Sequence, residues 1–155
     1  MKVLNKVLET ILAVLVAVMV LGCIWQVATR FILNNPSKYT EEFLRYALIW
    51  LTMLGVPYAY GQERHLSINI ITRTFTEKGS LRLKLFIEVL ITVISVFVMI
   101  AGGWLVTANS AGQISPAMQI PMQLYYICVP LSGILMVIYS LSRFTGFLKQ
   151  LKEVQ

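Results

Sequence analysis

One stretch of the sequence decides the fold: residues 89–142 read VLITVISVFVMIAGGWLVTANSAGQISPAMQIPMQLYYICVPLSGILMVIYSLS and contain no charged side chain. A helix that crosses a lipid bilayer needs roughly 20 apolar residues. These 54 residues therefore have room for two such helices. The turn-forming segment QISPAMQIP at 113–121 lies near the middle of the stretch and indicates where the chain reverses.

Two further uncharged blocks precede this stretch, 20 residues at 10–29 and 17 residues at 46–62. The sequence thus predicts an all-α integral membrane protein that forms a single domain over residues 1–155. Its four predicted transmembrane helices are at about 8–33, 43–62, 84–109 and 122–144. A soluble helical bundle is the alternative, and it is disfavoured because no face of these blocks is polar enough to meet water.

Positive charge is distributed unequally between the two sides of the predicted spans. The two chain ends and the connection between spans two and three carry ten Lys or Arg residues, whereas the other side carries three. Lys and Arg accumulate on the cytoplasmic side of membrane proteins. Both termini and the connection 63–84 are therefore predicted to be cytoplasmic. The net charge of +6 reflects this topology and does not indicate a nucleic-acid partner.

The connection contains LSINIITRTFTEK at 66–78. Read as a helix, it places Ile68, Ile71 and Phe75 in one apolar stripe; read as a strand, it alternates imperfectly. A short helix lying in the membrane interface is the preferred prediction. Near the N-terminus, VLGC at 20–23 resembles a lipoprotein cleavage site, but apolar residues continue beyond Cys23, so an uncleaved first span is predicted.

Three charges mark the start of the second span, in YTEEFLRYALIW at 39–50. Thr40 is the predicted N-cap, and Glu41 and Glu42 in the first turn favour the positive end of the helix dipole. Glu41 lies four residues before Arg45, the order that favours an ion pair. Two roles stay open for these charges: contact with a partner at the periplasmic face, and stabilisation of the helix start alone.

Small and polar residues then follow one face of the second span, namely Arg45, Thr52, Gly55, Ala59 and Gln62. Gly55 and Ala59 form a small-xxx-small pair, which lets another helix approach closely. Contact with the other helices of this chain and contact with a second protein are both open. Pro57 is expected to bend the helix.

The third span begins with Arg82, Lys84 and Glu88, whose long side chains are expected to reach toward lipid headgroups. One face of this span is poor in bulk and is predicted to pack against another helix. The members of this face are Thr92, Ser95, Met99 and Gly102.

The sequence offers no set of residues for chemistry inside the membrane. Cys23 and Cys128 are far apart and have no CxxC partner, which argues against a thiol oxidase and a disulfide. His65 is the single histidine, whereas membrane haem subunits commonly use two axial ligands. Charged residues, the usual mark of an ion path, stay near the span ends. We therefore expect no enzyme, no cofactor, no metal site and no self-sufficient carrier, but a membrane subunit that works with another protein.

Two segments carry a recurrent pattern of residues. In YTEEFLRYALIWLTMLGVPYAYGQERHLSINI at 39–70 its members are Glu41, Glu42, Arg45, Trp50, Gly55 and His65. In SPAMQIPMQLYYICVPLSG at 115–133 they are Ser115, Pro116, Ile120, Pro121, Tyr126 and Pro130. In order and spacing, this pattern resembles that of the small membrane subunit of TRAP (tripartite ATP-independent periplasmic) transporters, of the DctQ and SiaQ type, and the sialic-acid members most.

The resemblance implies a subunit of the bacterial inner membrane that packs on a large, elevator-type membrane subunit. That partner imports a carboxylate, of the sialic acid or C4-dicarboxylate class, with sodium, after delivery by a periplasmic binding protein. Membrane lipids are the remaining expected contacts. The candidate partner-contact residues are Glu41, Glu42, Arg45, Trp50, Thr52, Gly55, Ala59, His65, Pro116 and Pro121. The alternative function is a small membrane anchor of a respiratory or redox complex.

Overall fold

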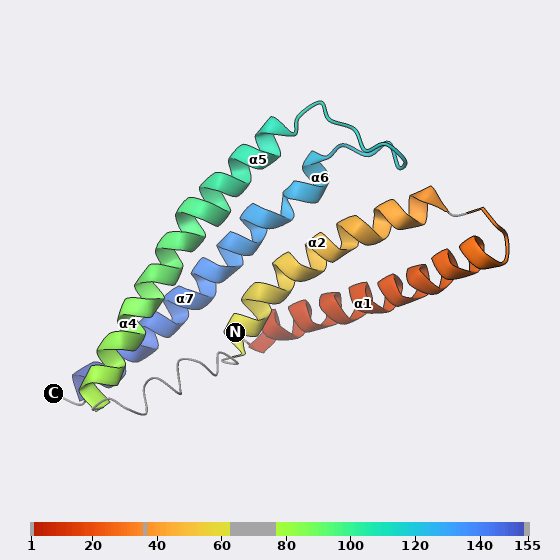
Figure 1. Cartoon of the computed structure of the whole chain (residues 1–155). Coiled ribbons are helices and arrows are strands. Elements are labelled where there is room, and N and C mark those ends of the chain that lie inside the picture. The colour runs from red at the N-terminus through yellow and green to blue at the C-terminus, as the bar shows by residue number, and fades with distance from the viewer. Residues whose placement is uncertain (1, 36, 63–76, 154–155) are drawn as a thin grey trace.

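The protein is a row of long helices in the computed structural model (Figure 1). The structure describes residues 2–35, 37–62 and 77–153. The interfacial helix predicted at 66–78 falls, except for its last two residues, outside the described residues, and so does His65.

The described elements follow one another in a simple order. They are α1 (Lys2–Phe31), α2 (Lys38–Gly61), α4 (Glu77–Ile94), the π-helix η1 (Ser95–Gly102), α5 (Gly103–Asn109), α6 (Gln123–Tyr126) and α7 (Cys128–Glu153). The segments α4, η1 and α5 follow one another without a break and together form one rod. The eight-residue π-helix in this rod was not predicted, because its sequence SVFVMIAG has the composition of an ordinary apolar helix.

Three of the described helical segments are long and apolar enough to cross a membrane: Lys2–Phe31, Leu83–Asn109 and Gln123–Phe147. They coincide with the predicted first, third and fourth spans. The second predicted span lies in α2, which has 24 residues but is not among the three. Charged residues in its first turns, its tyrosines and Pro57 lower its mean hydropathy, so four spans stay a prediction.

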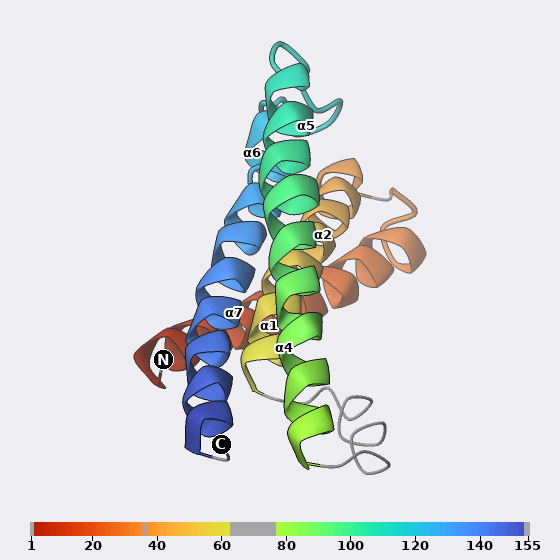
Figure 2. The ribbon, with the colours of Figure 1, turned by 90° about the vertical axis from the view of Figure 1, so that its left-hand side faces the viewer.

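The helices lie side by side in the order α1, α2, α7 and the α4–η1–α5 rod (Figure 1). Figure 2 views this row from the side of the rod and shows α1 crossing behind the other helices. A hydrophobic core forms where α1, α2 and α7 meet, from Leu8, Leu54, Tyr60, Met136 and Tyr139. Most other large apolar side chains of α1 and of the rod are exposed, which suits helices surrounded by lipid.

The start of α2 differs from the prediction. The N-cap is Ser37, whose Oγ accepts hydrogen bonds from the Thr40 backbone N–H at 3.4 Å and from the Thr40 hydroxyl at 2.9 Å. The assignment of Thr40 as N-cap was wrong by three residues, because Ser37 has the extended backbone that a cap requires and caps a helix at least as well as threonine. Before it, Asn34 adopts a left-handed backbone (φ 50°) just after the end of α1.

The predicted fourth span is divided into α6 and α7 at Ile127, three residues before Pro130. Proline lacks the N–H that would bond the carbonyl four residues earlier, and its ring clashes with that carbonyl. The Cys128 thiol donates to the Tyr125 carbonyl at 3.1 Å, which satisfies one backbone group near the break.

Glycines let α7 and the rod approach closely. A Cβ added at Gly133 would lie 2.8 Å from the Met99 Cβ and from the Ile100 Cγ1, and one at Gly103 would lie 2.9 Å from Val129 and Pro130. Ser95, on the small-residue face of the rod, is buried. The predicted face therefore packs against α7 at Met99 and Thr92, but Gly103, and not the predicted Gly102, makes the close approach.

Replacement of Gly133 by alanine is expected to lower the free energy of unfolding by about 1–3 kcal/mol, because the added methyl group overlaps atoms of η1. Reversible unfolding of the detergent-solubilised chain measures the change. Gly146→Ala is the matched control on the same helix, since no atom lies within 4 Å of a Cβ there and alanine favours a helix. Equal stabilities for Gly133→Ala and the unchanged chain would contradict the close approach.

Candidate partner-binding site

Glu42 is buried at the start of α2 and binds the loop between α5 and α6. Its side chain is 7% exposed. Its Oε2 accepts hydrogen bonds from the backbone N–H groups of Ala117, at 2.7 Å, and Met118, at 3.0 Å. One carboxylate therefore links segments that are 75 residues apart in the sequence.

The loop itself is folded into a tight turn that presents these N–H groups. The Ser115 N–H donates to the Ile120 carbonyl at 3.0 Å, and an isolated antiparallel bridge joins Ile114 to Pro121. Gln119 takes a left-handed backbone (φ 56°). Pro116 and Pro121 bracket the turn and remain exposed. The Ser-Pro and Ile-Pro dipeptides thus shape a surface turn, and Glu42 holds it against α2.

The surroundings of Glu42 favour its charged form. Burial raises the pKa of this carboxyl, but the Ser115 hydroxyl and the N–H groups of Met118 and Ala117 outweigh burial, and the pKa lies below its usual value of 4.5. Beside it, the rings of Tyr46 and Tyr125 stack with centroids 3.5 Å apart. The start of α2, the loop and α6 are therefore held as one unit.

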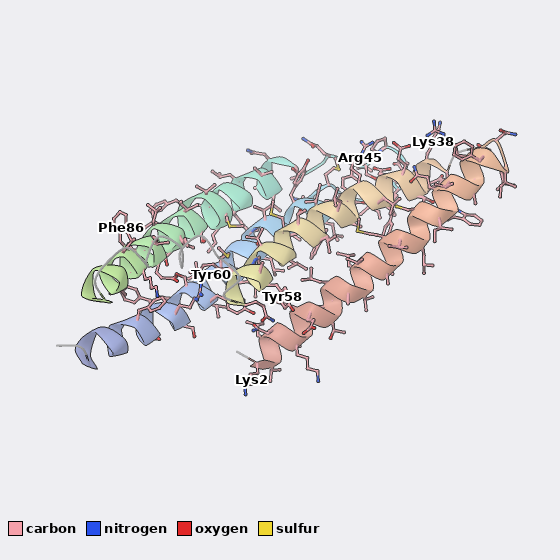
Figure 3. All side chains as sticks on the ribbon, turned by 60° about the horizontal axis from the view of Figure 1, so that its bottom comes forward. Lys2, Lys38, Arg45, Tyr58, Tyr60 and Phe86 are labelled. Atoms are coloured by element: carbon pink, nitrogen blue, oxygen red, sulfur yellow. The ribbon has the colours of Figure 1, made fainter. Side chains whose placement is uncertain are left out.

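Glu41 and Arg45 face outward, unlike Glu42. Arg45 Nη2 lies 3.2 Å from Glu41 Oε1, and the side chains are 70% and 58% exposed, respectively. Figure 3 shows Lys38 and Arg45 on the first turns of α2. A shallow open groove of about 500 Å³ crosses this region, and its lining residues are Lys38, Tyr39, Glu41, Glu42, Arg45, Tyr46, Pro116 and Ala117. The adjacent acids thus have different surroundings: one binds the chain itself and one faces the surface.

The small-residue face of α2 is open from Arg45 to Ala59, whereas Gln62 at its end is half-buried. Arg45, Thr52 and Ala59 are exposed, and no described atom beyond its own helix lies within 4 Å of a Cβ added at Gly55. The Thr52 hydroxyl donates to the Leu48 carbonyl at 2.9 Å, so its polar group is satisfied within the helix. Packing of Gly55 against the other helices of this chain is not observed among the described residues.

Trp50 lies on a different face of α2 from these residues. It packs, partly buried, against the hydrophobic core and lines an apolar groove. The structure therefore brings Glu42 together with the turn of Pro116 and Pro121, and places Arg45, Thr52, Gly55 and Ala59 on one open face. It separates Trp50 from both groups.

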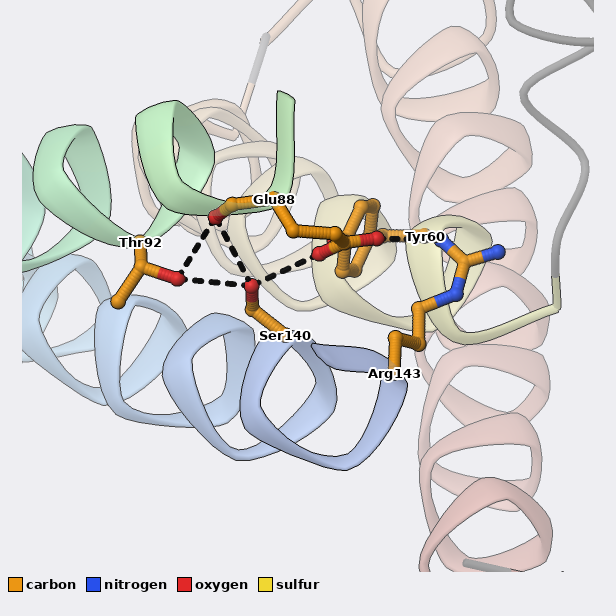
Figure 4. Close-up of polar contacts among 5 residues, drawn as sticks. All are labelled: Tyr60, Glu88, Thr92, Ser140 and Arg143. Atoms are coloured by element: carbon orange, nitrogen blue, oxygen red, sulfur yellow. Dashed lines mark hydrogen bonds and ion pairs between the residues drawn. The ribbon is translucent and has the colours of Figure 1, made fainter. Parts of the chain in front are cut away.

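A second polar cluster joins three helices around Glu88 (Figure 4). Glu88 is 4% exposed, and its Oε2 accepts hydrogen bonds from the hydroxyls of Tyr60 and, at 2.8 Å, Ser140. The Thr92 hydroxyl lies 2.8 Å from the Ser140 hydroxyl. Arg143 Nη1 lies 3.7 Å from Glu88 Oε1. These groups connect α2, α4 and α7.

The expectation that Glu88 reaches toward lipid headgroups is wrong. Its carboxylate points into the row because Tyr60, Ser140 and Arg143 supply donors there, and a buried carboxylate requires such partners. The Arg143 guanidinium also lies 4.8 Å from the centre of the Tyr60 ring. A sequence signal exists: Glu88 and Thr92 are four residues apart, and Ser140 and Arg143 are three apart, so each pair shares a helix face.

The described polar side chains either connect the helices of this chain or lie at its surface. Among them, no group of three or more His, Cys, Asp or Glu side chains lies where it could hold a metal ion. The two buried carboxylates, Glu42 and Glu88, are bound by other parts of the chain. The ion pair on α2 and the open face beside it are exposed.

Fold and site together define a helical membrane protein whose polar clusters tie its own helices together. The chain belongs to the family of the DctQ component of tripartite ATP-independent periplasmic transporters, whose family model matches residues 19–150. It is therefore a small permease subunit of a TRAP transporter, located in the bacterial inner membrane.

Three relatives agree with this family. The chain is 29% identical over 132 residues to a putative TRAP transporter small permease protein of Haemophilus influenzae, covering 85% of this chain and 81% of the relative. It is 27% identical over 153 residues to the sialic acid TRAP transporter small permease protein SiaQ of Vibrio cholerae, covering 99% and 88%. It is 27% identical over 129 residues to the ectoine TRAP transporter small permease protein TeaB of Halomonas elongata, covering 83% and 67%. A redox-complex anchor is accordingly not favoured.

Proposed function

We propose that this chain is the non-catalytic support of a sodium-coupled TRAP transporter. It packs on the large, elevator-type membrane subunit, which imports a carboxylate delivered by a periplasmic binding protein. Sialic acid or a C4-dicarboxylate is the proposed substrate class, and the match to the sialic acid subunit over 99% of this chain supports it. The residues that select the substrate are then expected on the partner proteins.

The proposed topology has four membrane crossings in one domain, with both termini in the cytoplasm. At 1.5 Å per residue, the 24 residues of α2 extend about 36 Å, which exceeds the hydrocarbon thickness of about 30 Å. The Lys and Arg bias supports the orientation. The charged start of α2 and the turn at 115–121 then lie at the periplasmic surface.

The main support for the proposed contact with the large subunit is the open face of α2. In lipid, helices associate through small residues that allow close backbone approach, and Gly55 and Ala59 offer such a surface. The neighbouring helices α1 and α7 flank α2 without covering Gly55. A partner helix seated on this face also meets Thr52 and, at the periplasmic end, Arg45.

The periplasmic groove next to this face is the proposed place for charged contacts with the partner subunits. Glu41, Arg45 and Lys38 supply charges there, and Pro116 lines the same groove. Glu42 contributes indirectly, because it fixes the turn on which Pro116 and Pro121 lie. Trp50 and His65 remain proposed contact residues without a described role on this face.

Replacement of Gly55 by leucine is expected to reduce co-purification of the large subunit at least tenfold, because the side chain blocks close helix approach. Tenfold corresponds to about 1.4 kcal/mol of association free energy. The measurement is the ratio of the two subunits after affinity purification from membranes.

Gly146→Leu is the control for the Gly55 variant. It introduces the same side chain at a second glycine with no atom within 4 Å of an added Cβ, but on α7. It should leave the subunit ratio unchanged. A normal ratio for Gly55→Leu would remove the open face of α2 from the proposed interface.

A further inference from the structure

A wholly apolar groove lies between α1 and α7, with α2 as its floor. We name it the α1–α7 groove. Its volume is about 380 Å³, and its lining residues are Leu8, Ile11, Leu15, Trp50, Leu54, Leu131, Ile134 and Leu135. None of these side chains is charged, and none belongs to the two carboxylate clusters. Figure 1 shows α1 and α7 on opposite sides of α2 and diverging from one another.

The groove is built on fixed parts of the fold. Leu8 in its α1 wall and Leu54 in its floor are each 4% exposed and belong to the hydrophobic core. At the end nearest the N-terminus, the Tyr139 hydroxyl donates to Asn5 Oδ1 and links α7 to α1. This bond and the core set the distance between α1 and α7 at this end of the groove.

A neighbouring depression on α1 shares Ile11 and Leu15 with the α1–α7 groove. This second apolar depression is lined by Thr10, Ile11, Val14, Leu15 and Val18. The Thr10 hydroxyl donates to the Lys6 carbonyl at 2.8 Å, so it requires no polar partner from outside the helix. From Leu8 to Val18, the groove and the second depression together cover about 15 Å of α1, at 1.5 Å per residue.

We propose that one acyl chain of a membrane phospholipid occupies the α1–α7 groove. The protein resides in the inner membrane, so hydrocarbon is the medium that meets this surface. The 15 Å length equals half of the roughly 30 Å hydrocarbon core, which is the depth of one leaflet. The α1–α7 groove begins beside the charged first turns of α1. Lys2 and Lys6 there place positive charge at the level of the phosphate group of a phospholipid.

A helix of the large subunit fits this groove less well than an acyl chain. A helix with its side chains is at least about 10 Å wide, so one 5.4 Å turn occupies on the order of 400 Å³ or more. That is as much as the whole groove. The groove also lies on the opposite side of α2 from the open face of Thr52 and Ala59, since Trp50 and Leu54 form its floor.

The test compares two isoleucines on α7 that are one turn apart. Ile134 lines the groove and is 48% exposed, whereas Ile138 does not line it and is 43% exposed. Ile134→Trp fills the groove, and Ile138→Trp adds the same volume beside it. The full chain is purified in mild detergent with added phosphatidylethanolamine and phosphatidylglycerol, and native mass spectrometry counts the phospholipids retained.

We expect the unchanged chain and Ile138→Trp to retain one phospholipid more than Ile134→Trp. Leu15→Trp and Val16→Trp repeat the comparison on α1, where only the first residue lines the groove. Equal counts in both pairs would overturn the proposal. So would a normal lipid count for Ile134→Trp together with loss of the co-purified large subunit, which would assign the groove to that protein. The Gly55→Leu variant should keep its lipid, so failure of the open-face contact and failure of this proposal are distinguishable.

Discussion

Replacement of Glu88 by alanine is expected to lower the free energy of unfolding by about 3–5 kcal/mol, the usual effect of removing one partner of a buried ion pair. The Glu88 carboxylate is the shared acceptor for Tyr60 and Ser140 and lies 3.7 Å from Arg143. Its removal leaves these donors buried without that acceptor and weakens the connection between α2, α4 and α7. Reversible unfolding in mixed micelles gives the free energy.

Glu41→Ala is the matched control for the Glu88 variant. Both acids pair with an arginine, and the Glu41–Arg45 distance of 3.2 Å is the shorter one. Exposed pairs contribute only about 0–1 kcal/mol, because water already solvates both charges. The loss of unfolding free energy should therefore be larger for the buried Glu88 than for the exposed Glu41, although the Glu41 pair has the shorter distance. Similar effects for the two variants would contradict the assignment of Glu88 as the connecting group.

The double variant Glu88→Ala with Arg143→Ala separates pairing from loss of packing. If the two side chains interact, the double variant should lose less stability than the sum of the two single variants. Glu88→Gln should fall between the unchanged chain and Glu88→Ala, since the amide keeps an acceptor for Tyr60 and Ser140 but loses the charge.

Replacement of Glu42 by alanine is expected to release the turn at 115–121 from α2. Two hydrogen bonds to a carboxylate are lost at once, so amide exchange in the turn should accelerate at least about tenfold. Hydrogen exchange read by mass spectrometry on the peptide spanning the turn measures this. If Pro116 and Pro121 contribute to partner contact, substrate uptake by the complete transporter should fall as well.

The same contact predicts a pH dependence with a definite sign. The pKa of Glu42 is lowered in the folded protein, so its carboxylate stabilises the turn at pH values above 4.5. That stabilisation is lost as the pH falls from about 4.5 through the lower pKa of the folded state. Protection of the turn should be constant from neutral pH to about 4.5 and decrease in stronger acid. Glu42→Gln should lack this step, whereas Glu41→Gln should retain it; a step that persists in Glu42→Gln would assign it to another group.

Much of the fold could be predicted because it is local. Three predicted spans coincide with apolar helices, since one apolar block of sufficient length specifies a membrane helix by itself. The Glu41–Arg45 pair was also predictable, because residues four apart meet on any helix. The N-cap was misplaced by three residues because Ser37 and Thr40 are both good caps and the local sequence does not rank them.

The sequence by itself determined that this chain is a helical inner-membrane protein of the TRAP small-subunit type, because apolar length, charge bias and motif order are properties of the linear chain. Only the tertiary structure decided what each acid does. Glu41 and Glu42 are adjacent, yet one faces the surface and the other binds a turn 75 residues away. Glu88 likewise accepts a hydrogen bond from Ser140, which lies 52 residues away in the sequence. Such pairings depend on how helices pack, and no periodicity along one helix encodes the identity of its neighbour.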